Sequence, residues 1–250
     1  MVESEWPSRT TRQELIHRLR RFYGTICVIC GYRGWMLQSP RRTTKILEVS
    51  KLGCVRGDRR LFSGLNFAVS PGTYVQLTGP NGSGKTSLLR ILCGLLPPAE
   101  GEISWQGANI RSIGEEYVAA VTYLGHRHGV KDELTAIENL RITNALNGIV
   151  VSQERAREAL GQLGLAGRES LPARLLSEGQ RRRVALTRLL VCNTKLWLLD
   201  EVLTSLDKSA VALVRSLIEN HLNGGGIAIV ATHQELELAA GCTKRLELTT

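Results

Sequence analysis

The feature that most constrains the fold of this chain is a glycine-rich octapeptide that ends in a lysine and a threonine. It reads Gly79-Pro80-Asn81-Gly82-Ser83-Gly84-Lys85-Thr86. The segment follows an apolar run at 74–77 and precedes an apolar helical pattern at 87–92, so the spacing G-x-x-x-x-G-K-T stands between a strand and a helix. Glycines let successive backbone N–H groups point inward, and the helix N-terminus adds partial positive charge. We therefore predict a polyphosphate-binding loop in which Lys85 reaches the β- and γ-phosphates and Thr86 binds Mg²⁺, with an ordinary glycine-rich turn as the alternative.

Short apolar runs alternate with helical patterns after residue 45, which is typical of an α/β domain. The expected strands cover residues 46–49, 74–77, 121–124, 196–199, 227–231 and 245–248. The clearest helical face begins near Asp207 and ends at the glycines 224–226. Residues 132–176 are rich in helical patterns and contain no convincing strand. We expect them to form a helical subdomain inserted in the sheet-based core.

Composition excludes several classes of protein. The chain has 250 residues, of which 43% are hydrophobic and 22% charged, as expected for a globular protein rather than a disordered one. No stretch approaches the roughly 18 consecutive apolar residues of a spanning helix. The net charge is +9, but residues 1–45 hold nine basic and three acidic residues and so most of the excess. Residues 46–250 are close to neutral, and no specific nucleic-acid partner is predicted.

Residues 1–45 form a basic leader without sustained periodicity. Its apolar piece, residues 25–30, is too short and too late for a secretory signal. Three interpretations stay open: a disordered segment, a misplaced start codon with translation beginning at Met36, or an electrostatic tether to anionic lipid. Mass spectrometry of the native N-terminus would separate the second from the others.

The six cysteines show no repeated spacing, which favours a reducing compartment over a disulfide framework. Cys27 and Cys30 form a C-x-x-C pair, but no second ligand pair follows at the spacing of a zinc finger. We therefore interpret this pair as part of an apolar segment, with metal or redox use as the minor alternative.

A second candidate site lies at Asp200 and Glu201, directly after the four apolar residues 196–199. A buried strand delivers its C-terminal residues to the crevice where α/β folds bind ligands. We predict that Asp200 holds Mg²⁺, by way of water, and that Glu201 polarises an attacking water. A strand followed by an acidic turn is the alternative.

The segment Leu176-Ser177-Glu178-Gly179-Gln180 then identifies the family. It resembles the LSGGQ signature of ATP-binding cassette (ABC) ATPases, with Glu178 at the third position, and the similarity covers about residues 46–248. Ser177 and Gln180 also have the spacing of a capping box, which opens a helix. The resemblance implies a P-loop NTPase fold of ABC-ATPase type, in which the signature helix faces the nucleotide of a second cassette. The implied ATP-binding residues are 79–86, Ser87 and, from the opposite subunit, Ser177 to Gln180.

Two later pieces are similar to the same family. Ser205-Leu206-Asp207 resembles the loop that joins the two cassettes, and His233 resembles the switch histidine that follows the strand at 227–231. In the family, such a histidine bonds the γ-phosphate while a carboxylate, here Glu201, acts as base. Lys85, Glu201 and His233 are therefore the predicted catalytic residues, and Thr86 and Asp200 the predicted metal ligands.

Two positions depart from the family pattern. Arg56 stands where an aromatic side chain normally stacks on adenine, and it could stack through its guanidinium plane or be merely solvated. His126 stands where the family has a glutamine that meets the metal and water. Because protonation removes the acceptor of an imidazole near pH ~6.5, we expect ATPase activity to fall at mildly acidic pH partly through His126.

The run from 123 to 140 narrows the resemblance to the ATP-binding subunit of the cytochrome c maturation haem exporter. This implies an ATP-hydrolysing subunit at the cytoplasmic face of a bacterial inner membrane. It would dimerise with itself or a similar cassette and bind a transmembrane permease. Whether ATP drives haem export or releases a haem chaperone stays open. The alternatives are a lipid or drug exporter, a non-transport ABC ATPase and a regulatory nucleotide-binding subunit.

Overall fold

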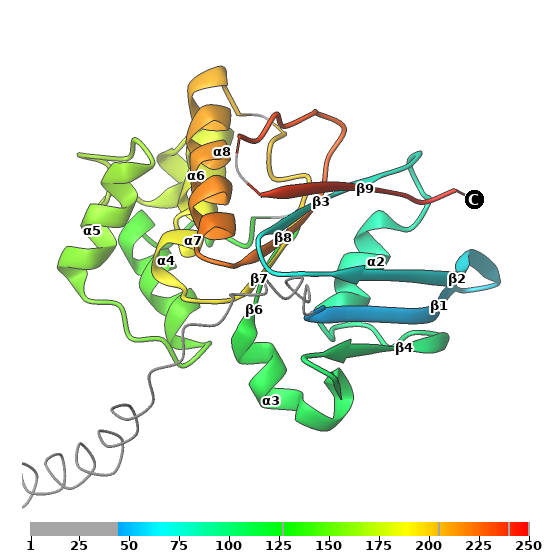
Figure 1. The fold of residues 1–250 in the computed structure, drawn as a ribbon. Helices are drawn as coiled ribbons and strands as arrows, with labels where there is room; N and C mark the ends of the chain where they lie inside the picture. The colour runs from blue at the N-terminus through cyan, green and yellow to red at the C-terminus, as the bar shows by residue number, and fades with distance from the viewer. Residues whose placement is uncertain (1–44, 127, 205, 240, 250) are drawn as a thin grey trace, which may run out of the picture. The chain divides into compact units, whose positions relative to one another are not determined.

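A five-stranded parallel sheet organises the fold (Figure 1). The structure is a computed structural model that describes residues 45–126, 128–204, 206–239 and 241–249. The strands lie in the order β6-β7-β8-β3-β9. Their bounds are β3 (Thr73–Thr78), β6 (Val121–Leu124), β7 (Leu196–Asp200), β8 (Ile227–Ala231) and β9 (Cys242–Glu247). Every residue of β7 and β8 is buried, which explains why these strands are continuous apolar runs in the sequence.

A second, antiparallel sheet has the order β2-β1-β4-β5. Its strands are β1 (Leu47–Arg56), β2 (Arg59–Val69), β4 (Glu100–Trp105) and β5 (Ala108–Asn109). The sequence prediction was wrong about the extent of this sheet, because it found only residues 46–49. The register between β1 and β2 shifts at three places between Val49 and Val55, so the regular alternation of buried and exposed residues is lost after the fourth residue.

Helices cover both faces of the parallel sheet (Figure 1). Helix α2 (Lys85–Leu92) shares an apolar cluster with β1 of the antiparallel sheet and with Leu198 and Ile229 of the parallel sheet. Helix α8 (Lys208–Asn223) packs against the opposite face, with Trp197 and Val230. Neighbouring residues of β7 and β8 point to opposite faces, so the two strands contribute to both clusters. Helix α3 (Ile110–Ala120) leads into β6.

The chain between β6 and β7 is helical. It contains α4 (Ala136–Ala145), α5 (Gln153–Gln162), a short 3-10 helix η1 (Ala173–Leu175), α6 (Glu178–Leu186) and α7 (Arg188–Val191). These helices share a third apolar cluster of their own, which includes Leu140, Leu160 and Val184. The range 132–176 holds α4, α5 and η1, and the extended pairing within it is a single bridge from Thr135 to Pro172.

Two predicted boundaries illustrate what local sequence determines. Helix α8 begins after the N-cap Asp207, whose side chain accepts from the Ala210 N–H, and it ends at the C-cap Gly224, as predicted. The last strand was predicted at residues 245–248, but β9 spans Cys242–Glu247. That prediction was wrong at both ends because β9 is mostly exposed and polar, so an apolar run does not mark its start.

Several sequence predictions concern residues outside the described ranges. They are the basic leader up to residue 44, the start at Met36, the Cys27–Cys30 pair, and Ser205 of the loop that resembles a cassette contact. Among the helices that the structure describes, none has the length and apolar character needed to cross a membrane.

Candidate functional site

In the loop between β3 and α2, a side chain would collide with the main chain at one glycine and be crowded at another. Gly79 has a φ of 143°, and a Cβ there would lie 2.6 Å from the carbonyl oxygen of Leu248. Gly84 has a φ of 102°, and its Cβ would lie 3.1 Å from the ring of Phe62. Other residues avoid such backbone conformations. The path of the loop therefore requires glycine at both positions.

Two polar side chains of this loop are nearly buried. Lys85 is 7% exposed, and its Nζ donates to the carbonyl oxygens of Gly79 at 2.7 Å and Pro80 at 3.1 Å. Ser83 is 1% exposed, and its Oγ has no hydrogen-bond partner among the described residues. A buried hydroxyl without a partner is costly. Together with the N-terminus of α2 and the lysine, it suits a ligand that brings several anionic oxygens.

Asp200, at the end of β7, has the surroundings of a cation ligand. Its side chain is 1% exposed, and its Oδ2 lacks a hydrogen-bond partner within the described part of the chain. Burial raises the pKa of this carboxyl, while a hydrogen bond with the Thr86 side chain acts to lower it. A buried carboxylate beside a hydroxyl offers the oxygen ligands that Mg²⁺ prefers. The residues present therefore fit a magnesium ion.

Glu201 and His233 meet beside Asp200. The Glu201 N–H donates to the Ala231 carbonyl at 2.9 Å, which ties the residue to the end of β8. His233 follows β8 by two residues, and its Nε2 lies 3.9 Å from Glu201 Oε1. Both side chains remain partly open to solvent. Glu201 has a φ of 52°, a left-handed conformation that is strained for a residue with a Cβ.

His126 completes the set of side chains at this edge of the sheet. It follows β6 by two residues and is exposed, and its charged form would lower the pKa of Asp200. The strands β6, β7, β8 and β3 are parallel, so the residues that follow them gather at one edge. The structure thus brings together the glycine-rich loop, His126, Asp200, Glu201 and His233.

The signature-like segment opens α6 through the predicted capping box. Ser177 Oγ accepts from the Gln180 N–H at 3.3 Å, and Gln180 Oε1 accepts from the Ser177 N–H at 3.0 Å. Ser177 and Glu178 are exposed. Within the described residues, no hydrogen bond or ion pair joins residues 177–180 to the glycine-rich loop. The start of α6 is therefore open to a ligand or a second molecule.

Comparisons with known proteins agree with this geometry. The sequence profile described as ABC transporter matches residues 62–204. The "Cytochrome c biogenesis ATP-binding export protein CcmA" of Nitrosospira multiformis is 61% identical over 81% of this chain and 98% of its own length. The protein of the same name from Nitrosomonas europaea is 56% identical over 82% of this chain and 96% of its own length. The chain belongs to the CcmA family of ABC ATP-binding subunits.

A solved structure supports the fold class. An ABC transporter ATP-binding protein from Pyrococcus furiosus is 25% identical, with a TM-score of 0.68 over 80% of this chain and 96% of that one. The predicted fold, a P-loop NTPase of ABC-ATPase type, is therefore confirmed. As a member of this family the chain binds ATP. The roles of its individual site residues stay predictions, and the structure adds their positions.

Arg56, the position expected to face adenine, lies at the end of β1 and is exposed. Two residues earlier, the Cys54 thiol interacts with the Ser87 side chain of α2, so this end of β1 borders the helix that follows the glycine-rich loop. Burial raises the pKa of Cys54. Arg56 is thus exposed near the start of α2, and its stacking on a base stays a prediction.

Asp207, predicted to lie at a contact between cassettes, also has contacts within the chain. It caps α8, and its Oδ2 accepts from Arg183 of α6 at 2.8 Å. Hydrogen bonds from Ala210 and Ser209 lower the pKa of this exposed carboxyl. The ion pair joins the loop after β7 to the signature helix, so a contact at Asp207 would act on α6 directly.

Sequence reasoning missed the side chains that support the site. Phe62 of β2 packs against Gly84, and Arg182 of α6 donates to the carbonyl oxygen of His126 at 3.0 Å. The run of three arginines at 181–183, directly after a capping box, was the available signal for Arg182. No local signal marks Phe62, because its contact depends on the fold of the whole β1–β2 hairpin.

Proposed function

We propose that this chain is the ATP-hydrolysing subunit of an ABC exporter that serves cytochrome c biogenesis at a bacterial inner membrane. The observation that carries the proposal is the meeting of a phosphate-binding loop with Asp200, Glu201 and His233 at one edge of the parallel sheet. The pathway follows from the names of the relatives. Residues 46–250 act as one ATPase domain, with residues 132–176 as its helical subdomain.

In this mechanism the loop N–H groups and Lys85 hold the triphosphate, and Arg56 supports the base. Thr86 and Asp200 would hold Mg²⁺, which neutralises charge that develops on the phosphate oxygens. Glu201 accepts the proton of the attacking water, while His233 and His126 orient that water against the γ-phosphate. His233 Nε2 and Glu201 Oε1 lie 3.9 Å apart, close enough for one water beside the pair to contact both groups.

The proposed active assembly contains two cassettes. The exposed start of α6 has no described bond to the chain's own glycine-rich loop, which supports a role toward the ATP of a second copy or a similar cassette. A helix N-terminus stabilises an anion through its dipole. ATP would then hold the two protomers together until hydrolysis removes the γ-phosphate.

A groove supports the proposed membrane partner. A cavity of about 880 Å³ is bordered by α3, the end of α4 and α7. The apolar side chains of Leu95, Val118 and Leu146 at this cavity are exposed. Arg188 also lines it and has no side-chain bond or ion pair to a described residue. We take the occupant to be a permease segment that carries apolar side chains and one carboxylate.

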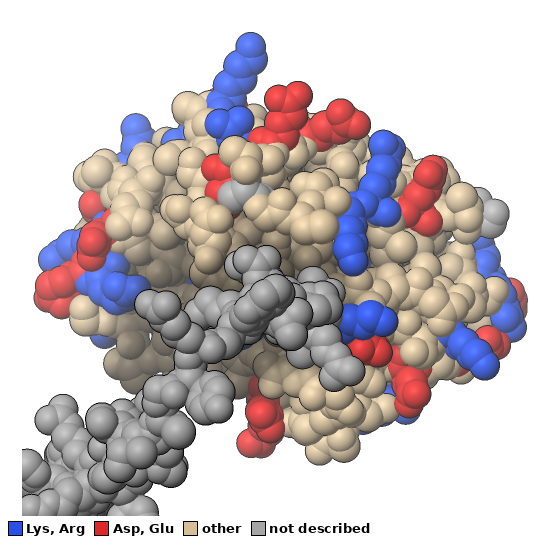
Figure 2. Space-filling model, viewed as in Figure 1, with Lys and Arg blue, Asp and Glu red and all other residues tan. Residues whose placement is uncertain are grey.

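Charge on the face drawn in Figure 2 is mixed in sign. Figure 2 shows lysine and arginine side chains interspersed with aspartate and glutamate over this face. A surface that tracks a phosphate backbone gathers cations in one stripe. The described residues on the face drawn in Figure 2 show no such stripe.

The hydrolytic part of the proposal is tested with the purified full-length chain. Glu201→Gln should bind fluorescent ATP with unchanged affinity, release phosphate at least about 100-fold more slowly, and accumulate as an ATP-bound dimer. Glu237→Gln is the matched control, because this exposed glutamate makes no described contact. Equal phosphate release by the wild type and Glu201→Gln would contradict the assignment.

The cellular part is tested in the bacterium that encodes the chain. Deleting its gene should abolish covalently bound haem in c-type cytochromes, and the wild type but not Glu201→Gln should restore it. Leu146→Glu should release the protein from membranes, whereas Leu175→Glu, an exposed leucine outside the groove, should not. Normal cytochromes in the deletion strain would overturn the proposed pathway.

A further inference from the structure

The segment that follows β6 is fixed to the signature helix by a buried arginine. Arg182, in α6, is 4% exposed, and its Nη1 donates to the main-chain oxygen of His126 at 3.0 Å. Among the described residues, this is the one hydrogen bond that the Arg182 guanidinium makes. The Nε of Arg182 has no partner among them. A buried charge that loses its last hydrogen bond is strongly destabilised. The bond should therefore persist when α6 moves.

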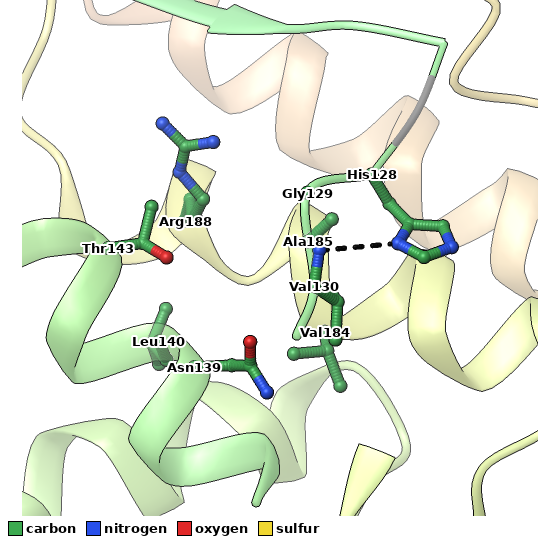
Figure 3. A pocket seen from close by; sticks show the side chains of 9 residues that line it. All are labelled: His128, Gly129, Val130, Asn139, Leu140, Thr143, Val184, Ala185 and Arg188. Atoms are coloured by element: carbon green, nitrogen blue, oxygen red, sulfur yellow. Dashed lines mark hydrogen bonds between the residues drawn. The ribbon is translucent and has the colours of Figure 1, made fainter. Parts of the chain in front are cut away.

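A second contact joins the same two elements two residues later. His128 Nε2 lies 3.3 Å from Glu178 Oε1, at the start of α6. The other ring nitrogen, Nδ1, accepts from the Val130 N–H at 3.3 Å, as the dashed line in Figure 3 shows. The accepting Nδ1 leaves the proton on Nε2, which faces the carboxylate. His128 thus links its own loop to the first residue of the signature helix.

Further bonds extend this connection to α4. Arg181 contacts both Glu178, at 3.1 Å, and Asp132, at 3.5 Å. Asn139 of α4 accepts from the Lys131 N–H at 2.7 Å and donates to the Lys131 carbonyl at 2.9 Å. Figure 3 shows residues 128–130 lying between α4 and α6. Residues 126 and 128–132 are therefore held mainly by helices of the inserted region.

We propose that Arg182 and His128 are positioning residues that make His126 move with the start of α6. The inference rests on the proposed function, in which His126 meets the chain's own nucleotide and residues 177–180 meet the neighbour's. Contact of the neighbour's ATP with α6 would shift the Arg182 bond and carry His126 with it. The two nucleotide sites of a dimer would thereby be coupled through one helix and one main-chain carbonyl.

A double-mutant cycle on the full-length chain tests this coupling. Arg182→Met removes the donor and keeps the apolar stem, Arg182→Lys restores a donor, and Arg215→Met on the exposed face of α8 is the matched control. Each variant is made in the wild type and in His126→Ala. Phosphate release gives kcat, fluorescent ATP gives the dissociation constant, and thermal unfolding reports whether each variant folds.

We expect Arg182→Met to lower kcat about 10-fold with less than a twofold change in ATP affinity, because only the placement of His126 is lost. Arg182→Lys should recover part of the rate, and Arg182→Met should lower the rate less than twofold further in His126→Ala. If Arg182→Met lowered kcat by the same factor in the wild type and in His126→Ala, the proposal would be overturned. An unchanged kcat in the single variant His126→Ala would also overturn it. Wild-type protein without ATPase activity would instead refute the proposed function.

If Arg182→Met does not fold, His128→Ala decides the matter. His128 is partly exposed, so its replacement leaves no buried charge behind. We expect a loss of about threefold in kcat that disappears in His126→Ala. The same loss in both backgrounds would overturn the inference.

Discussion

Replacing Gly79 by alanine should separate two costs in the phosphate-binding loop, backbone strain and a collision. Gly79 and Gly82 both have positive φ, 143° and 82°, so alanine at either position costs about 1–3 kcal/mol of strain. A Cβ at Gly79 would also lie 2.6 Å from the Leu248 carbonyl oxygen, whereas nothing lies within 4 Å of one at Gly82. Forcing an atom into such a packed site costs about 1–3 kcal/mol more. Gly79→Ala should therefore be less stable than Gly82→Ala by about 2 kcal/mol.

The assay is thermal and urea unfolding of both full-length variants without nucleotide. For a chain of this size a difference of about 2 kcal/mol corresponds to about 4–8 °C in Tm. Gly94→Ala, which has φ of 79° and open space but lies outside the loop, controls for strain alone and should match Gly82→Ala. Equal stability of Gly79→Ala and Gly82→Ala would refute the collision and the loop geometry derived from it.

Three further outcomes follow from the contacts described above. Burial lowers the pKa of His221, which stacks on Trp197 with 3.8 Å between ring centroids. The unfolded chain therefore binds protons more readily at His221 than the folded chain does. The contribution of His221 to the free energy of unfolding is complete above pH ~6.5 and is lost as the pH drops below it. In urea unfolding from pH 7 to 5, His221→Phe should make the free energy of unfolding depend less on pH. Ser177→Ala and Ser152→Ala each remove an N-cap and should each cost about 1 kcal/mol, but only Ser177→Ala should also slow phosphate release. Phe62→Leu should lower the unfolding free energy by about 1 kcal/mol and weaken ATP binding in a fluorescence titration, because this ring packs on Gly84.

The elements that could be predicted are those whose signals are local. The buried strand before Asp200, the glycine-rich loop and both ends of α8 each depend on residues within a few positions of one another. The convergence of His126, Asp200 and His233 also follows from sequence, since parallel strands place their carboxyl ends at one edge. For this part of the site, motif and fold class together determine the arrangement.

The rest depends on contacts between distant segments. The antiparallel sheet was mostly missed because the irregular register of β1 interrupts the period on which strand prediction depends. The bond from Arg182 to His126 spans 56 positions, and the packing of Phe62 on Gly84 requires the hairpin to be in place first. The run of arginines at 181–183 marks the region of Arg182 but does not identify its partner, and no short window of sequence distinguishes Phe62 from an ordinary core phenylalanine.

The left-handed backbone at Glu201 has a consequence for how this enzyme can be altered. Glycine or asparagine adopts a left-handed backbone with less strain than glutamate. Either replacement should therefore raise the free energy of unfolding and, because it removes the proposed proton acceptor, abolish ATP turnover. Selection for thermostability alone, without selection for activity, should enrich such replacements at position 201. In the proposed mechanism, glutamate at this position supplies the proton acceptor at the cost of a strained main chain.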